Sequence, residues 1–454
     1  MSDESEPQPP TLQRLAEKFR SAMHALGKSP EEPDLEKWAV LIHSSMSGRG
    51  RSYHTVEHVF QVDGGVDAIG TLAILFHDTV YCEIDGGLPR GLEQYLGDAL
   101  QVDGDHVELG PFDPKEDTMR ALTARIFGFT PGQAVTFQTG LNELASALLA
   151  VRSLDSHLSP AELAQVVTCI EATIPFRPQE AEETLATRLT EADGEHGLGL
   201  GDEGVAVAVR RAVRVANSDV GNFAYDDAAA FLSHTWEIIP ETNPTLRAPA
   251  YTLGEYRQAM AKMESFLRNL DAGRVFRTFR GTPSDEALAD MLGRAKANLR
   301  RGSRYLRQKH LAARFLETLA DLSGGDAPVS LFMGDLPSEA VGLRLEHLMA
   351  KPTPTAADAD PTVFRLLVEG RKKDSGFDLR HSPLAAHFYA EMGDAKSDAV
   401  LDAEDGWPLL EALPSALSAR IARACAQIAS TRSAKLIAIA ERLEGPQPAS
   451  KRIG

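Results

Sequence analysis

Cysteine is scarce in this chain, and long apolar runs are missing. Its three cysteines, Cys82, Cys169 and Cys425, are far apart and odd in number, which argues against a disulfide framework and a cysteine-based zinc site. No apolar run approaches the roughly 20 residues that span a bilayer, so no membrane segment is expected. The N-terminus has neither the basic start nor the apolar stretch of a signal peptide. We therefore expect a cytoplasmic protein with reduced thiols.

Positive charge is also in short supply. The 454 residues include 47 Lys and Arg against 65 Asp and Glu, for a formal net charge of -18. A surface of this charge repels the nucleic-acid backbone, so no long nucleic acid is expected as a partner. A small phosphorylated substrate remains compatible, because a bound divalent cation dominates the electric field at short range.

Helical patterns of apolar residues recur along the chain, whereas no convincing alternation typical of strands is found. Residues 68–81 are apolar on every side, as in a helix that is buried all round. Ser159 and Glu162 form a capping-box pattern around Pro160, which predicts that another helix begins there. The chain is therefore expected to be all-α. The other main expected helices cover residues 11–26, 141–152, 204–220, 253–270, 285–322, 338–349, 361–370 and 407–444.

His77 and Asp78 lie near the end of the apolar helix expected over residues 68–81. An ionised carboxylate buried there costs free energy unless a cation compensates it. The negative C-terminal end of the helix dipole adds to that cost. A bound metal ion would remove both costs. The dipeptide alone is a weak motif, because a chain with 13 histidines is expected to contain roughly one His-Asp pair by chance.

Two further segments direct metal-binding side chains toward the protein interior. His54 and His58 are four residues apart, which places them on one face of an expected helix, close to Val59. Asp219 ends a helical stripe of small apolar residues. Three helices would thus each deliver an imidazole or a carboxylate to one interior point. This ligand mixture suits Zn, Mn, Fe, Ni or Co better than metals that select thiolates.

The order of these residues resembles the HD superfamily of metal-dependent phosphohydrolases. The pattern is Tyr-His-x-x-x-His-Val at residues 53–59, then Leu-x-x-Leu-Phe-His-Asp at residues 72–78, then Asp219 on a later helix. Cyclic-nucleotide phosphodiesterases and small bacterial HD phosphohydrolases share it. The similarity covers roughly residues 30–230 and implies an HD-domain-like helical bundle with additional C-terminal helices.

The resemblance also implies a role for each residue of the pattern. His58, His77, Asp78 and Asp219 would bind one or two divalent metal ions, with Asp78 able to bridge two. The metal would be Mn, Mg, Zn, Fe, Ni or Co. His54 stands at the position that donates a proton to the leaving oxygen.

The substrate side departs from the family pattern. Many relatives carry a further histidine after a segment similar to residues 170–173, but residues 174–177 here read Ile-Pro-Phe-Arg. Arg177 is therefore the candidate to bind the substrate phosphate. Glu57 and Glu83 are candidates to orient the histidine ligands by hydrogen bonding to them.

The expected function is hydrolysis of a phosphomonoester or phosphodiester in a small molecule, foremost a nucleotide, by metal-activated water. A second possibility is an HD-fold di-iron oxygenase, which needs six protein ligands and would recruit His106 and His157. A third is a non-catalytic helical protein with a structural metal and a partner-binding C-terminal region. Residues 370–390 are polar and aromatic enough to form a docking or oligomerisation surface, and a homo-oligomer is left open.

The expected domain organisation follows from composition and from the resemblance. Residues 1–10 are acidic, rich in proline and expected to be disordered. An HD-type metal-binding domain is expected over residues 11–245, interrupted by a long irregular insertion at residues 82–120. A helical extension packed on this domain would cover residues 246–325, and a C-terminal helical region of unknown role residues 326–454.

Overall fold

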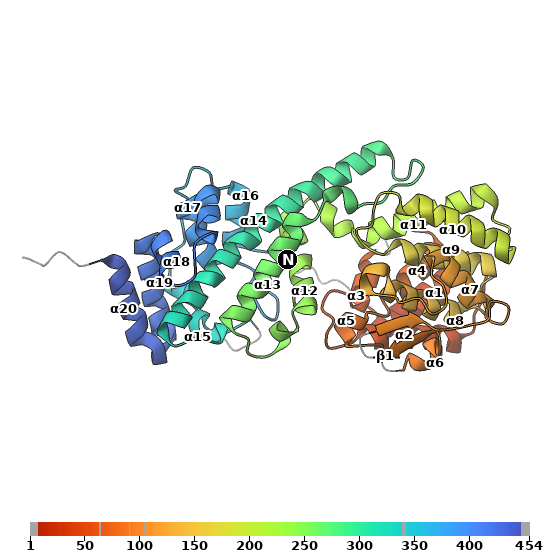
Figure 1. Cartoon of the computed structure of the whole chain (residues 1–454), viewed down its shortest axis with the longest axis horizontal. Coiled ribbons are helices and arrows are strands. Elements are labelled where there is room, and N and C mark those ends of the chain that lie inside the picture. Colours follow the sequence, from red (N-terminus) through yellow and green to blue (C-terminus); the bar gives the residue numbers. More distant parts are fainter. Residues whose placement is uncertain (1–7, 63–64, 90, 104–105, 338–341, 446–454) are drawn as a thin grey trace, which may run out of the picture. The chain divides into compact units, whose positions relative to one another are not determined.

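The computed structural model describes residues 8–62, 65–89, 91–103, 106–337 and 342–445. Within these ranges the chain forms twenty α-helices and one two-stranded sheet, which confirms the all-α fold (Figure 1). Most of the tail expected to be disordered lies outside the described residues. No helix in the described ranges is both long enough and apolar enough to cross a lipid bilayer.

The chain divides into two compact units. Unit 1 consists of Met1–Ala224 and Asp271–Ala295, and unit 2 consists of Tyr225–Leu270 and Lys296–Gly454. This division differs from the boundaries expected after residues 245 and 325. The chain returns to unit 1 after its first passage through unit 2, and Phe279 is then buried in the hydrophobic core of unit 1.

Unit 1 contains the first eleven helices and both strands. Its helix α4, Ala68–Phe76, begins where the Asp67 side chain accepts a hydrogen bond from the backbone of Gly70. The helix expected over residues 68–81 ends earlier, with His77 as its C-cap. The other helices are α1 Thr11–Ala25, α2 Glu32–Met46, α3 Val56–Val62, α5 Cys82–Asp85, α6 Glu93–Leu96, α7 Thr118–Phe127, α8 Leu141–Leu154, α9 Pro160–Ala172, α10 Ala181–His196 and α11 Gly201–Asp219.

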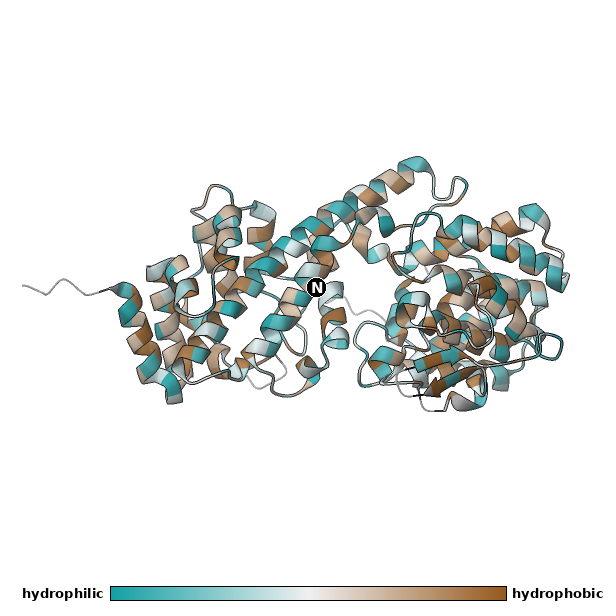
Figure 2. Ribbon diagram, viewed as in Figure 1, coloured by the Kyte–Doolittle hydropathy of each residue, from teal (hydrophilic) through white to brown (hydrophobic). Residues whose placement is uncertain are grey.

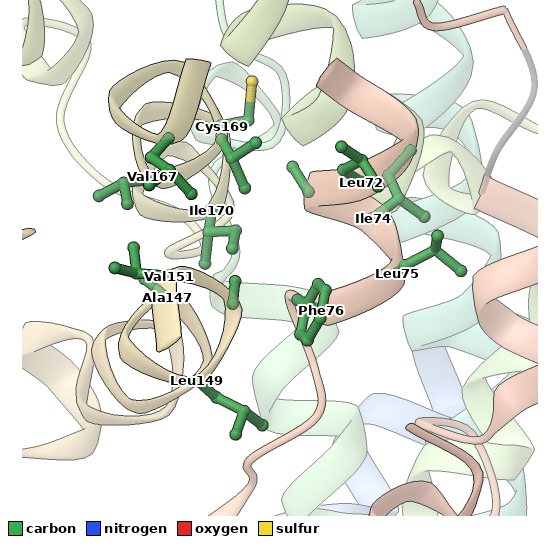
Figure 3. Close-up of a cluster of buried hydrophobic side chains, with 14 of the residues drawn as sticks. Leu72, Ile74, Leu75, Phe76, Ala147, Leu149, Val151, Val167, Cys169 and Ile170 are labelled. Carbon is green, nitrogen blue, oxygen red and sulfur yellow. The ribbon is translucent and has the colours of Figure 1, made fainter. Parts of the chain in front are cut away.

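Helix α4 lies at the centre of unit 1, in contact with α1, α8, α9 and α11. All its residues from Leu72 to Phe76 are buried, as the all-round apolar sequence predicts. Figure 3 shows Phe76 of α4, Ala147 of α8 and Ile170 of α9 gathered between these three helices. Ser159 and Glu162 form the expected capping box at the start of α9. The apolar packing therefore fixes the end of α4, where His77 and Asp78 follow.

The insertion expected to be irregular contains regular structure. Strands β1 Leu100–Asp103 and β2 His106–Leu109 form an antiparallel pair in which Leu100 lies opposite Leu109 and Asp103 opposite His106. Helices α5, α6 and the first residues of α7 also lie in residues 82–120. The strands were not predicted because each has only four residues, which is too short for an alternating pattern to stand out.

The regular elements of unit 2 are all helices over its described residues. Its core includes Phe315 and Phe388, whose ring centroids are 5.1 Å apart in an edge-to-face contact. Figure 2 shows polar and apolar residues interleaved along its helices, as expected where one face of each helix is buried. The helices are α12 Ala228–Thr242, α13 Leu253–Asn269, α14 Asp285–Ser323 (which begins in unit 1), α15 Val329–Met333, α16 Pro361–Glu369, α17 Pro383–Leu401, α18 Trp407–Ala412, α19 Ser415–Ile428 and α20 Ser433–Glu444.

Several details of unit 2 differ from expectation. The region 407–444 is broken into α18, α19 and α20 rather than forming continuous helix. Part of the helix expected over residues 338–349 lies outside the described residues, and its described end forms only a short 3-10 turn at Leu345–Leu348. The segment expected to form a docking surface, residues 370–390, is partly internal: Arg371 and Asp378 are buried and contact each other, whereas Lys372, Lys373, Asp374 and Arg380 are exposed.

Candidate metal centre

The four predicted ligands converge on one point in unit 1. His58 lies on α3, His77 caps α4, Asp78 follows it, and Asp219 is the last residue of α11. One potential ligand atom from each residue lies within 4.8 Å of all the others. His77 and Asp219 are 142 residues apart in sequence, and His58 and Asp219 are 161 residues apart. The fold thus brings them together at a site small enough for one ion to contact all four side chains.

The distances at this site show imidazoles directed at carboxylates. His58 Nε2 lies 3.0 Å from Asp219 Oδ1, and His77 Nε2 lies 3.0 Å from Asp78 Oδ2 and 3.3 Å from Asp219 Oδ1. The other ring nitrogen of His77, Nδ1, is 2.8 Å from the Ile74 carbonyl oxygen, to which it donates. That bond leaves the Nε2 lone pair facing two carboxylates, an arrangement that is favourable only with a proton or a metal ion between them.

The electrostatics of the site point the same way. Burial disfavours the imidazolium, yet Asp78 and Asp219 raise the pKa of His77 well above its ordinary value. Burial also disfavours both carboxylates, but the neighbouring histidines together outweigh it, lowering the pKa of Asp78 below its usual range and that of Asp219 to about 2. The site therefore favours ionised carboxylates beside positive charge.

The four candidate ligands differ in their exposure to solvent. The side chains of His58 and His77 are 4% and 1% exposed, whereas those of Asp78 and Asp219 are 18% and 17% exposed. The imidazoles are therefore the more deeply buried ligands of the centre, and the carboxylates keep partial contact with solvent.

The Arg51 side chain binds the backbone of the two segments that carry His54 and Asp78. It is buried, pairs with Asp85 through Nη2 at 2.6 Å, and donates from Nη1 to the carbonyl oxygens of Asp78 at 2.6 Å and His54 at 3.2 Å. Nη2 also donates to Thr79 O at 3.1 Å. Sequence reasoning missed Arg51, because a single arginine in a loop carries no periodic signal.

The start of helix α8 holds the segment that follows Asp78. Ser146 Oγ accepts a hydrogen bond from Val80 N at 3.1 Å, and Asn142 Oδ1 accepts one from Cys82 N at 3.0 Å. The side-chain amide of Asn142 also donates to Glu83 at 3.0 Å. Glu83 thus contacts α8, and no hydrogen bond to a histidine ligand is found for it within the described ranges.

Glu143 is a second residue that sequence reasoning missed. Its Oε2 atom is buried and has no hydrogen-bond partner within the described part of the chain. Burial raises the pKa of Glu143 to about 7, with Asp78 and Asp219 adding to the rise and Arg177 opposing it. A buried carboxyl that keeps its proton near neutral pH beside two ionised carboxylates is typical of functional sites. Its position three residues before Ser146, on one face of α8, is the signal that could have found it.

His54 does not lie on the helix that was expected to carry it, because α3 begins at Val56. The loop before α3 nevertheless keeps it beside the ligands, with its ring centroid 5.9 Å from that of His58. His54 is also close enough to lower the pKa of Asp78 electrostatically. The expected proton donor is therefore placed at the edge of the centre.

Arg177 is held by a buried carboxylate. Its two terminal nitrogens bond both oxygens of Glu171, with Nη2 to Oε2 at 3.0 Å, and Arg277 donates to the Arg177 carbonyl oxygen at 3.0 Å. The preceding residue, Phe176, adopts the left-handed backbone region at φ 54°, which turns the chain at this point. The positive charge of Arg177 lowers the pKa of Glu143, which Asp78 and Asp219 raise. The Nε–H group of Arg177 is buried and left without an acceptor among the described residues.

The remaining sequence candidates lie away from the ligands. Glu57 forms an ion pair with Arg14 at 3.1 Å and its side chain is 58% exposed. His106 lies on β2 with its side chain 59% exposed, and His157 pairs with Asp34 at 3.2 Å. Neither of these histidines belongs to the ligand group found in the described residues, which has four members rather than six.

Comparison with known proteins adds no relative. No family model, no curated protein and no solved structure matches this chain. The interpretation of the site therefore rests on its residues and their geometry.

Proposed function

We propose that this protein is a metal-dependent phosphohydrolase of the HD type that cleaves a phosphomonoester or phosphodiester bond in a small molecule. The observation that carries the proposal is the convergence of His58, His77, Asp78 and Asp219 within 4.8 Å, with carboxylates that no lysine or arginine of the described residues neutralises. Two imidazoles and two carboxylates form a donor set typical of divalent transition metals at hydrolytic sites.

The residues present fit such an ion. His77 is oriented by its bond to the Ile74 carbonyl, as histidine ligands usually are by a backbone or carboxylate acceptor. His58 is buried and directed at Asp219. Arg51 fixes the backbone that carries Asp78. When bound, a divalent ion lowers the pKa of a water molecule and neutralises phosphoryl oxygens.

The surrounding residues then supply binding and proton transfer. His54, beside the ligands, is placed to donate a proton to the leaving oxygen, a contribution typically worth about 10²–10⁴-fold in rate. Arg177 stays the candidate to bind an anionic oxygen of the substrate, for which its terminal nitrogens would have to exchange a bond to Glu171. Glu143 holds a proton near neutral pH and provides a second group able to exchange one.

The decisive experiment combines metal analysis with a hydrolysis panel. Purified wild type, Asp78→Ala and the control Asp202→Ala are analysed for bound metal and assayed with Mn²⁺ on nucleotides, sugar phosphates and chromogenic phosphodiesters. Asp202 is exposed at the opposite end of the helix that carries Asp219, so the control should keep both metal and activity.

We expect Asp78→Ala to lower the affinity for metal by more than the roughly 10–100-fold that is typical when a residue supporting a ligand is replaced. Hydrolysis should be lost together with the metal. Full metal occupancy and unchanged turnover in this variant would contradict the proposal. Metal bound by wild type without hydrolysis of any panel member would favour a structural metal.

A further inference from the structure

One buried arginine of unit 1 contacts two segments that reach the candidate metal centre. Arg277 lies in the stretch 271–295, which follows α12 and α13 of unit 2 in the chain but belongs to unit 1. Arg277 is only 4% exposed, and its Nε atom lies 3.4 Å from Glu182 Oε1, which compensates its charge. Phe276 and Phe279, on either side of it in sequence, are buried as well. This apolar packing fixes the backbone from which the Arg277 side chain extends.

The guanidinium group of Arg277 holds the turn that carries the candidate phosphate ligand. Its Nη1 donates to the Arg177 carbonyl oxygen at 3.0 Å, and its Nη2 donates to the Ile174 carbonyl oxygen at 2.9 Å. These carbonyls stand at the two ends of the turn after α9, in which Phe176 adopts the left-handed backbone region. A planar fork of donors on two carbonyls of one turn fixes the backbone of that turn. The point from which the Arg177 side chain extends is thereby fixed too.

The backbone of Arg277 holds the end of α11. Its N–H group donates to Asn217 Oδ1 at 2.6 Å, and its carbonyl oxygen accepts a hydrogen bond from Asn217 Nδ2 at 2.9 Å. Asn217 is buried and lies two residues before Asp219 on the same helix. Arg277 therefore contacts the turn of Arg177 with its side chain and the helix end that carries Asp219 with its backbone.

We propose that Arg277 is a positioning residue that holds Arg177 and Asp219 in the arrangement in which both can act on one phosphate group. This inference rests on the proposed function and adds the residue that aligns substrate binding with metal binding. The alternative is a purely structural arginine. Arg120 exemplifies it, because it is also buried in unit 1, and its Nη2 donates to the carbonyl oxygens of Asp98 at 2.7 Å and Gly110 at 3.1 Å, which flank the two-stranded sheet.

Binding of inorganic phosphate in the presence of Mn²⁺ tests this role. Calorimetry compares wild type with Arg277→Lys, Arg177→Gln, the double variant and the matched control Arg120→Lys. Lysine keeps the positive charge but lacks the planar fork of donors. Glutamine at position 177 leaves Glu171 beside Arg188, whose Nη1 lies 3.5 Å from Glu171 Oε1.

We expect Arg277→Lys to weaken phosphate binding by roughly 10- to 100-fold, because a displacement of about 1 Å at a binding group can have an effect of this size. Arg177→Gln should weaken it at least as much. The double variant should be no weaker than Arg177→Gln, since Arg277 acts through Arg177. For a hydrolysed substrate, Arg277→Lys should raise KM and leave kcat nearly unchanged. Arg120→Lys should match wild type in all these measurements.

Asn217→Ala tests the second contact and is informative even if Arg277→Lys does not fold. It removes both hydrogen bonds between α11 and the Arg277 backbone, so we expect the affinity for Mn²⁺ to fall by about 10-fold, as when a supporting residue is replaced. The control Asn298→Ala removes a buried amide of unit 2 that donates to the Tyr225 carbonyl oxygen at 2.7 Å, and it should bind Mn²⁺ as wild type does. Unchanged Mn²⁺ affinity in Asn217→Ala would overturn the inference that this contact positions Asp219.

The outcomes separate this inference from the proposed function. Non-additive losses of phosphate affinity in a protein that hydrolyses no phosphoester would support the positioning role and reject the hydrolase. Additive losses, or a loss in Arg120→Lys equal to that in Arg277→Lys, would overturn the positioning role in a protein that remains a hydrolase. Wild type that binds no phosphate in Mn²⁺ would overturn both.

Discussion

Asp378 in unit 2 and Asp78 in unit 1 are carboxylates withdrawn from water, and their partners differ in kind. Asp378 Oδ2 lies 2.7 Å from Lys309 Nζ and accepts a hydrogen bond from Trp236 Nε1 at 2.7 Å, while Arg371 Nη1 lies 3.4 Å away. Among the described residues, the ion-pair partners of the Asp78 carboxylate are imidazoles, with His77 at 3.0 Å and His58 at 3.7 Å.

The difference separates a structural cluster from a candidate metal-binding site. Lysine and arginine are always charged near neutral pH, so Asp378 is compensated by the chain itself. Imidazoles carry a full charge only when protonated, so Asp78 and Asp219 retain the capacity to attract a cation. Two buried acidic sites in one chain thus differ in their charge compensation, and the type of cationic neighbour decides which one is the candidate for metal binding.

The largest expected effect in this comparison comes from Asp378→Ala. Lys309 and Arg371 would remain buried without their carboxylate, so we expect the free energy of unfolding to fall by about 3–5 kcal/mol, with or without Mn²⁺. Urea unfolding measures it. Asp398→Ala removes an exposed partner of Arg307 and should cost less than about 1 kcal/mol. Equal costs for the two variants would show that the buried cluster is not held by Asp378.

Glu143→Gln tests the acidity of the metal-free centre. The folded-state pKa of Glu143 is about 7, above its ordinary value of 4.5, so the folded state holds this proton more tightly than the unfolded state. The free energy of unfolding of wild type should fall by up to roughly 3 kcal/mol as the pH rises from 4.5 to 7.

The glutamine variant cannot ionise and should lack this decline, as measured by urea unfolding in EDTA at a series of pH values. The exposed Glu57→Gln variant serves as control and should follow wild type. An identical pH dependence in wild type and Glu143→Gln would show that this carboxyl is not buried as described.

The smallest expected effect is stabilisation by metal. Mn²⁺ at about 100 times its Kd should raise the free energy of unfolding of wild type by about 2.7 kcal/mol. Asp219→Asn should lose this gain, and Asp202→Asn on the same helix should keep it. Hydrogen exchange should show the added protection in unit 1 peptides and not around Asp378. Equal added protection in both units would contradict the prediction that the metal binds in unit 1 alone.

Much of unit 1 could be predicted because its signals are local. The all-round apolar run before His77 predicted the buried helix α4, and the stripe that ends at Asp219 predicted that this residue faces inward. The Ser159 capping box follows the same logic, since its bonds span three residues. His54 was misplaced onto a helix, because four-residue spacing is shared by helices and by the loop that precedes α3.

The residues that were missed act through long-range contacts. Arg51 reaches Asp85 and the backbone of Asp78, and Glu143 meets the centre only after α8 packs beside α4. The return of residues 271–295 to unit 1 is equally invisible to local patterns.

By itself, the sequence determined that the chain is all-α and that Asp78 and Asp219 are carboxylates near the interior, because apolar periodicity and the cost of a buried charge depend on near neighbours; the set of four candidate ligands came from the family resemblance. Tertiary structure decided that the Asp78 carboxylate pairs with imidazoles whereas that of Asp378 pairs with lysine and arginine. Such pairings join segments far apart in the chain, and packing alone brings them within range of one another.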